Sequence, residues 1–271
     1  MAKARLDVLL VERGLAASRE RARTLIMAGR VLVGGQKVEK AGTAVKKESE
    51  IRLLGEDLPY VSRGGLKLEK AIRVFSLSLA GKTMADVGAS TGGFTDCALQ
   101  NGAAKVYAID VGYGQLAWKL QSDPRVEVHD RTNVRTLDPA SVAPAPELVV
   151  GDMSFISLTL VLPALVAAAA PHADFLLMVK PQFEIGKERL GHGGVVRNPE
   201  HHVETVETVA RCAIELGLDI AAIAASPLPG PSGNVEYFVH MRRDYPDPID
   251  PTQLTDYIRR AVEAGPAGGF R

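Results

Sequence analysis

Short apolar runs alternate with longer amphipathic segments along the last two-thirds of the chain. Apolar runs that lack internal polar positions predict strands buried on both faces, as in a parallel sheet covered by helices. The predicted strands are Thr83–Val87, Lys105–Ile109, Val126–His129, Glu147–Val150, Ala173–Val179, Leu218–Ala225 and Tyr237–Met241. The predicted helices are Leu66–Phe75, Gly93–Gln100, Gln115–Gln121, Ser157–Ala170, Pro199–Leu216 and Thr252–Ala264. Only a loop joins the last two strands, which predicts that the final strand runs antiparallel.

The beginning of the chain has shorter elements. An apolar helical face covers Leu6–Val11, and Ser18 is a good N-cap for a second helix over Arg19–Ala28. Two runs of strand-forming residues follow at Val31–Val33 and Glu50–Leu54. This pattern predicts two helices that pack on a small, hairpin-rich sheet.

The two patterns meet near Pro59, within the expected hinge Gly55–Ser62. We predict a small α+β domain over residues 1–58, a linker over 59–65 and an α/β domain over 66–271. The α/β domain is expected to hold a Rossmann-like sheet, mostly parallel with its last strand antiparallel. Such a sheet binds ligands beyond the carboxyl ends of its strands, near the point where the strand order reverses.

Charge is distributed unevenly, although the net charge of the 271 residues is zero. Residues 1–70 hold 15 Lys and Arg against 9 Asp and Glu, and residues 71–271 hold 17 against 23. A basic small domain joined to an acidic larger one suggests that the small domain binds a polyanion. The alternative is an ordinary solvated basic face.

Composition argues against several classes of protein. With only Cys97 and Cys212, a disulfide framework or a zinc cluster is not expected, and the six histidines show no ligand spacing, so we expect no metal. No apolar run reaches the roughly 20 residues that span a bilayer. The N-terminal residues lack the apolar segment of a secretory signal. We therefore expect a cytoplasmic protein with no membrane partner.

The turn after the first predicted strand is the most informative motif. An acidic residue near the strand end is followed by small residues that lead into a helix. The turn does not fit G-x-G-x-x-G, and no phosphate-loop lysine follows it. S-adenosylmethionine suits it better, because that cofactor carries positive charge and has no pyrophosphate. The candidate cofactor residues here are Asp86, Gly88, Ala89, Ser90, Thr91, Gly92, Gly93 and Phe94.

Further polar residues follow the next strands. Asp110 ends the second strand, where an acid can accept from ribose hydroxyls. Asp130 could accept from the adenine amino group, with Asn133 as the competing candidate. Val111 and Phe155 could enclose the adenine, or both could belong to the core.

A second set of strand-end residues suggests chemistry. Asp152 follows the fourth strand, Lys180 ends the fifth, and Glu236 opens the last strand, so an antiparallel last strand brings all three to one edge. Each has an ordinary alternative, since a strand-end acid is often a helix cap and a strand-end lysine is often solvated. Several acids and a lysine together at one edge are harder to explain in that way.

With Lys67, these residues resemble the Lys-Asp-Lys-Glu tetrad of ribose 2′-O-methyltransferases of the FtsJ/RrmJ type; Lys70, one turn along, is the alternative for the first lysine. The strings Asp152-Met153-Ser154-Phe155-Ile156-Ser157, Val179-Lys180-Pro181-Gln182-Phe183-Glu184 and Gly233-Asn234-Val235-Glu236-Tyr237-Phe238 look specifically like the TlyA family. The resemblance implies an S-adenosylmethionine-dependent transfer of methyl to cytidine ribose in 16S and/or 23S ribosomal RNA. It also implies that Lys67, Asp152, Lys180 and Glu236 are catalytic. Whether Lys180 is a base or an ammonium that stabilises the oxygen remains open, because its expected neighbours favour opposite states.

Residues 3–54 resemble the small RNA-binding module named after ribosomal protein S-four. The similarity lies in Arg5-Leu6-Asp7, Ser18-Arg19, Leu25-Ile26 and Val31-Leu32-Val33-Gly34-Gly35. It implies ribosomal RNA or ribosomal subunits as partners. The expected RNA-binding residues are Lys3, Arg5, Arg19, Arg23, Arg30, Lys40 and Arg63.

Two other functions compete with this interpretation. One is a membrane-active haemolysin, which the lack of a spanning segment disfavours. The other is a non-catalytic RNA-binding or ribosome-assembly factor, which the tetrad and the cofactor turn disfavour. The Gly-rich segment Glu184–Asn198 is either a mobile lid over the RNA or an inert surface loop.

Overall fold

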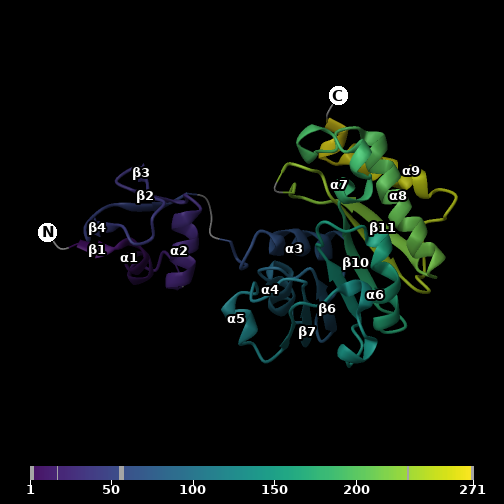
Figure 1. Cartoon of the computed structure of the whole chain (residues 1–271), viewed down its shortest axis with the longest axis horizontal. Helices are drawn as coiled ribbons and strands as arrows, with labels where there is room; N and C mark the ends of the chain where they lie inside the picture. Colours follow the sequence, from purple (N-terminus) through teal and green to yellow (C-terminus); the bar gives the residue numbers. More distant parts are fainter. Residues whose placement is uncertain (1–2, 17, 55–57, 231, 270–271) are drawn as a thin grey trace. The chain divides into compact units, whose positions relative to one another are not determined.

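The computed structural model describes residues 3–16, 18–54, 58–230 and 232–269. The chain divides into two compact units, Met1–Leu58 and Pro59–Arg271 (Figure 1). Each unit has a hydrophobic core of its own.

The first unit combines two helices with short strands. Helix α1 spans Leu6–Glu12 and helix α2 spans Arg19–Met27, with the Ser18 hydroxyl accepting a hydrogen bond from Arg21 N at the start of α2. Antiparallel pairing joins β1 to β4 and joins β2 to both β3 and β5. The strands are β1 (Lys3–Arg5), β2 (Val31–Val33), β3 (Gln36–Lys37), β4 (Ala44–Lys46) and β5 (Ile51–Leu53). The apolar faces of both helices bury Leu6, Leu10, Leu25 and Ile26 in one core.

The second unit is built on a seven-stranded sheet, counted over its described residues, with the order β11-β12-β10-β9-β6-β7-β8. All neighbouring pairs are parallel except those made by β12, which is antiparallel to both β10 and β11. The strands are β6 (Thr83–Val87), β7 (Lys105–Ile109), β8 (Val126–His129), β9 (Leu148–Gly151), β10 (Asp174–Val179), β11 (Asp219–Ala225) and β12 (Tyr237–Arg242). The prediction of a mostly parallel α/β sheet with an antiparallel last strand is confirmed.

Helices cover both faces of this sheet (Figure 1). One face packs against α3 (Gly64–Val74), α4 (Gly93–Gln100) and α5 (Trp118–Gln121), which share a core with Met84 and Val106. The other face packs against α6 (Leu162–Ala168), α8 (Pro199–Glu215) and α9 (Leu254–Ala264). A short helix, α7, spans Pro181–Glu184 directly after β10. Single-turn 3₁₀ segments lie at Val134–Thr136, Pro139–Ser141, Leu158–Leu160, Lys187–Arg189, His192–Gly194 and Pro266–Gly269.

The strand order fixes where a ligand can bind. The chain runs from β6 outward to β7 and β8, then crosses back to β9 on the other side of β6. The crevice at this reversal lies beyond the carboxyl ends of β6 and β9. Because β12 is antiparallel, Tyr237 at its start pairs with Val179 at the end of β10. Glu236 therefore reaches the same edge as Lys180.

Some predicted boundaries differ from the structure. The expected helix Ser157–Ala170 is a 3₁₀ turn over Leu158–Leu160 followed by α6, because Pro163 fits only the first turn of a helix. The expected helix Gln115–Gln121 is shortened to α5. The expected linker over 59–65 lies in the second unit, where Tyr60 is buried and Val61 N donates to Asp96 Oδ2. Residues 55–57 of the expected hinge lie outside the described residues.

Candidate active site

The turn after β6 begins at a buried acid. Asp86 is 1% exposed, and its Oδ2 accepts hydrogen bonds from Thr95 N at 2.9 Å and from Thr95 Oγ1 at 2.6 Å. Burial raises the pKa of Asp86 to about 7, the bonds from Thr95 oppose that rise, and the nearby charges of Asp152 and Asp110 add to it. A carboxyl group with a raised pKa is suited to bind a cation, because a nearby positive charge favours its ionised form.

Two glycines keep this turn compact. Gly92 has φ +95°, and a Cβ there would lie 2.3 Å from Leu120 Cδ1. A Cβ at Gly93 would lie 2.3 Å from Ser62 Oγ and 2.9 Å from Gly65 N. The starts of α3 and α4 can therefore approach each other only with bare backbone at this point. Of the predicted cofactor residues in the turn, Asp86, Gly88, Ala89, Ser90, Thr91, Gly93 and Phe94 line the adjoining cavity, whereas Gly92 shapes the turn.

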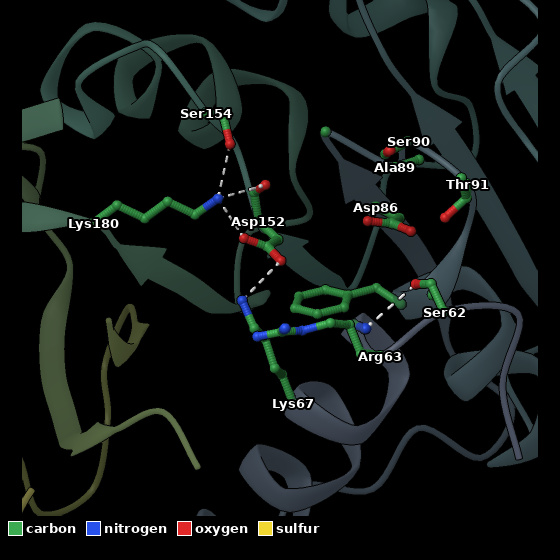
Figure 2. Close-up of a pocket in the computed structure, with 14 residues that line it drawn as sticks. Ser62, Arg63, Lys67, Asp86, Ala89, Ser90, Thr91, Asp152, Ser154 and Lys180 are labelled. Atoms are coloured by element: carbon green, nitrogen blue, oxygen red, sulfur yellow. Dashed lines mark hydrogen bonds and ion pairs between the residues drawn. The ribbon is translucent and has the colours of Figure 1, made fainter. Parts of the chain in front are cut away.

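Two adjoining cavities lie at this edge of the sheet. The first has a volume of about 240 Å³, lies against the turn and also contacts Ser62, Lys67 and Lys180 (Figure 2). The second, of about 350 Å³, is largely apolar and lies beyond the end of β7. Gly88, Ser90, Asp152 and Ser154 line both cavities. A compartment lined by charged side chains beside a largely apolar one fits a ligand that joins a charged amino acid to a nucleoside, as S-adenosylmethionine does.

The second cavity contains most of the remaining predicted cofactor residues. Asp110, Val111, Asn133 and Phe155 line it, and Val111 and Phe155 are 70% and 90% exposed. Asp110 accepts from Ser90 N at 2.8 Å and from Gly112 N at 2.7 Å, so its carboxylate also fixes the loops around the cavity. Asp130 does not line either cavity, and it accepts instead from Gly114 N. Of the two candidates for the adenine amino group, the geometry favours Asn133.

The four predicted catalytic residues form one connected chain of charges. Lys180 Nζ lies 2.6 Å from Asp152 Oδ1, and Asp152 Oδ2 lies 3.4 Å from Lys67 Nζ. Lys67 Nζ in turn lies 2.6 Å from Glu236 Oε2. Asp152 thus bridges the two lysines, and Glu236 pairs with Lys67 rather than with Lys180. Lys67 is buried on α3 and contacts both acids, while Lys70 is exposed, so Lys67 is the better candidate for the first lysine of the set.

Lys180 is held from three directions (Figure 2). Besides its ion pair with Asp152 Oδ1, its Nζ donates to the backbone oxygen of Asp152 at 3.2 Å and to Ser154 Oγ at 2.9 Å. Lysine is otherwise a flexible side chain, and here two hydrogen bonds and one ion pair restrict its ammonium group. The arrangement fixes a single charged group at the border of the first cavity.

A third cavity, of about 1010 Å³, lies on the other side of Lys180. Its lining includes Lys180, Ser154 and Glu236, together with aromatic and glycine residues of the segment after β10. The rings of Phe155 and Phe183 are 5.0 Å apart at an interplanar angle of 47°. Phe155 has φ +65°, an uncommon conformation for a bulky residue and one often found at functional sites.

Several residues of the site were not predicted from the sequence. Ser154 contacts Lys180, and Met178 Sδ lies 3.6 Å from Lys67 Nζ. Ser62 and Gln182 line the first and third cavities. Ser154 and Gln182 lie two residues after Asp152 and Lys180, so the strings around those two residues contained the signal. Nothing in the sequence distinguishes Met178 from the rest of an apolar strand.

The predicted RNA-binding residues of the first unit include a compact arginine cluster. Asp7 is fully buried and binds Arg5 at 3.0 Å, Arg19 at 3.3 Å and Arg23 at 3.3 Å, while each guanidinium is about half-exposed. These arginines, Arg5 foremost, hold the pKa of Asp7 well below its usual range. Arg30 Nε donates to Leu54 O, and Lys3 and Lys40 are exposed. Arg63, in the second unit, donates to Pro229 O.

No helix in the described part of the chain is long and apolar enough to cross a membrane. Over the same residues, no three or more His, Cys, Asp or Glu side chains come together as a group that could hold a metal ion.

Known proteins match both units of the chain. Residues 60–243 match the FtsJ-like methyltransferase family and residues 4–51 match the S4 domain. The 16S/23S rRNA (cytidine-2′-O)-methyltransferase TlyA of Mycobacterium tuberculosis is 49% identical, over 97% of this chain and 99% of that protein. Hemolysin A of Brachyspira hyodysenteriae is 36% identical over 87% of this chain and 98% of that one.

A solved structure from Streptococcus thermophilus, which has a hemolysin name, is also similar. It is 42% identical with a TM-score of 0.74, and the match covers 97% of each chain. Identity at this level across both units extends the likeness well beyond a shared fold. The chain, in which an S4 domain precedes the methyltransferase domain, therefore belongs to the FtsJ-like methyltransferase family, and within it to the TlyA group.

Proposed function

We propose that this protein transfers a methyl group from S-adenosylmethionine to the 2′-hydroxyl of cytidine in ribosomal RNA. The name of the Mycobacterium tuberculosis relative supports both the reaction and the substrate, and the level of identity supports carrying them to this chain. That name also supports 16S and 23S RNA as the two substrates to test. An enzyme that acts on ribosomal RNA meets it in the cytoplasm, which we propose as its location.

One observation carries the proposal. Lys180 and Ser154 line both the first cavity, beside the turn after β6, and the third cavity, beside Phe183 and Glu236. Residues that assist the direct transfer of a methyl group from one ligand to another have to lie where the two binding sites meet. The buried charges at that border support a reaction there rather than simple binding, because buried charged networks are costly to maintain.

The first two cavities are the proposed cofactor site. When bound, S-adenosylmethionine would supply a methyl group already activated by its sulfonium. Asp86 and the backbone from Gly88 to Gly93 would face its charged part, and Asp110 the ribose. Asn133, Val111 and Phe155 would surround the adenine.

The protein has two tasks in this reaction. It must align the ribose oxygen with the methyl group, and alignment alone can lower a barrier by roughly 7–11 kcal/mol. It must also manage the charge and the proton of the hydroxyl. We propose that Lys180 Nζ contacts the 2′-oxygen, that Asp152 and Ser154 fix the position of Lys180, and that Lys67 and Glu236 fix Asp152.

The first unit is the proposed RNA-binding domain. The S4-domain match and the basic composition of this part of the chain support that role. The half-exposed guanidinium groups of Arg5, Arg19 and Arg23 offer donors to phosphate oxygens. Further RNA contacts are predicted at Lys3, Arg30, Lys40 and Arg63.

Methyl transfer from labelled S-adenosylmethionine to purified ribosomal subunits and to bare ribosomal RNA tests the proposal. We expect label on cytidine ribose, and a loss of at least about 100-fold with Lys180→Ala, as for removal of a single catalytic donor. Lys70→Ala, an exposed lysine on α3, is the matched control and should retain activity. No label from a folded protein that binds the cofactor would contradict the proposal and favour an RNA-binding factor instead.

A further inference from the structure

Two residues that line the third cavity each have one buried side-chain oxygen without a hydrogen-bond partner among the described residues. These oxygens are Gln182 Oε1 and Glu236 Oε1. A buried acceptor without a donor is unfavourable, and native proteins seldom retain one unless a water or a ligand supplies the donor. Glu236 already binds Lys67 through its other oxygen, at the catalytic end of the cavity. Gln182 has no such role in the charged chain.

Gln182 lies where a nucleobase would be expected. It is on α7, two residues after Lys180, and both residues line the same cavity. In a nucleotide, the carbon that carries the 2′-hydroxyl is bonded to the carbon that carries the base. A ribose whose 2′-oxygen meets Lys180 therefore carries its base within a few ångströms of that point. Phe183 provides an aromatic surface in the same cavity, and such surfaces stack with bases of any sequence.

Stacking alone cannot distinguish cytosine from uracil, so a polar group has to do so. Cytosine presents a 4-amino donor where uracil presents a carbonyl acceptor. An amide oxygen can accept from the amino group but would face the uracil carbonyl as a second acceptor. Asn234, the other amide in the cavity wall, is already used, because it accepts from Val196 N at 3.0 Å and donates to Gly194 O at 2.9 Å.

We propose that Gln182 Oε1 accepts a hydrogen bond from the 4-amino group of the target cytidine and thereby selects cytidine over uridine. This inference rests on the proposed function. It adds a specificity-determining residue that neither transfers the methyl group nor belongs to the charged chain.

The test uses the full-length protein and RNA fragments that contain the methylated position. That position carries cytidine, uridine or 2-pyrimidinone riboside, which is cytidine without its 4-amino group. Methyl transfer is measured for wild type, Gln182→Leu and Gln182→Glu. Gln253→Leu, at an exposed glutamine before α9, is the matched control. Cofactor binding by each variant checks that the methyltransferase unit is folded.

We expect the wild type and Gln253→Leu to methylate cytidine about tenfold faster than 2-pyrimidinone riboside, the ratio that one hydrogen bond supplies. Gln182→Leu should treat the two alike, and Gln182→Glu, which keeps an acceptor, should retain the preference. A Gln182→Leu variant that keeps the wild-type ratio would overturn the inference and leave the proposed function intact. So would a wild type that shows no preference between the two substrates. Failure of the wild type to methylate any of the RNAs would overturn the proposed function, and this inference with it.

Discussion

Lys67 Nζ lies 2.6 Å from Glu236 Oε2, although 169 residues separate the two in the sequence. Both side chains are nearly inaccessible, at 5% and 1% exposure. Removing two charges from water costs free energy that their attraction often fails to recover, and apolar residues of similar size are frequently no less stable. The pair is therefore better explained by its contact with Asp152 than by a gain in stability.

Substitution of this pair should therefore affect the stability of the protein and its methyl transfer differently. Lys67→Met alone leaves Glu236 buried without its cation, and we expect the free energy of unfolding to fall by roughly 3–5 kcal/mol. The double variant Lys67→Met/Glu236→Leu should regain most of that loss in urea denaturation, yet remain inactive in methyl transfer. Activity in a stable double variant would show that the pair does not position Asp152.

Ser154 is expected to act through Lys180. Ser154→Ala removes one of the three oxygens around Lys180 Nζ, and the loss of one hydrogen bond of about 1 kcal/mol corresponds to a five- to tenfold fall in kcat. KM for the RNA and cofactor affinity should change little. Ser154→Thr keeps the hydroxyl and should restore much of the rate. A change confined to KM would assign Ser154 to RNA binding instead.

Asp86 should make cofactor binding depend on pH. Because its pKa is raised to about 7, the carboxyl is largely neutral below that pH and must lose its proton to pair with a cation. We expect the affinity for S-adenosylmethionine to rise with pH up to about 7, by at most about tenfold per pH unit, and then to level off. Titration calorimetry across this range measures the effect. Asp86→Asn should bind more weakly at high pH and show a flatter profile, and an unchanged profile would contradict the assignment.

The arginine cluster of the first unit predicts a different pH effect. The depressed pKa of Asp7 means that its stabilising contribution is present above the unfolded-state pKa of about 4 and is lost as the pH falls below it. Asp7→Asn should cost about 1–2 kcal/mol at neutral pH, since solvent screens the half-exposed guanidinium groups. Hydrogen exchange of the α1 and α2 amides reports on this unit alone. Equal exchange in the variant and the wild type at pH 7 would contradict the prediction.

The sequence predicted the strands well because buried parallel strands are continuous apolar runs. Every predicted strand of the second unit matches an observed one to within a residue at each end. The predicted helix ends differ more from the structure. Pro163 and the cap at Ser157 divide one segment whose composition is helical throughout. The predicted linker includes Tyr60 for a similar reason. Its burial depends on a core whose other residues are distant in the sequence, so no local pattern indicates it.

The candidate site could be predicted as a set of residues but not as a network. Asp152, Lys180 and Glu236 could be placed at one edge of the sheet, because strand direction alone determines which strand ends share that edge. The pairing of Glu236 with Lys67, and the bridging position of Asp152, depend on side-chain distances of a few ångströms. The unpartnered oxygen of Gln182 is a property of its surroundings, which no local pattern records.

The position of β12 within the sheet has a consequence for how the protein is made. This strand lies between β10 and β11 and is the last of the sheet to be synthesised, so β11 has no place in the sheet until β12 has been inserted. Synthesis proceeds from the N-terminus, and the earlier strands can pair while β12 is still inside the ribosome. Glu236 lies directly before β12, so it can pair with Lys67 only after this late part of the chain has been made. A nascent chain can thus present the turn after β6 long before it can complete the charged network that we propose for methyl transfer.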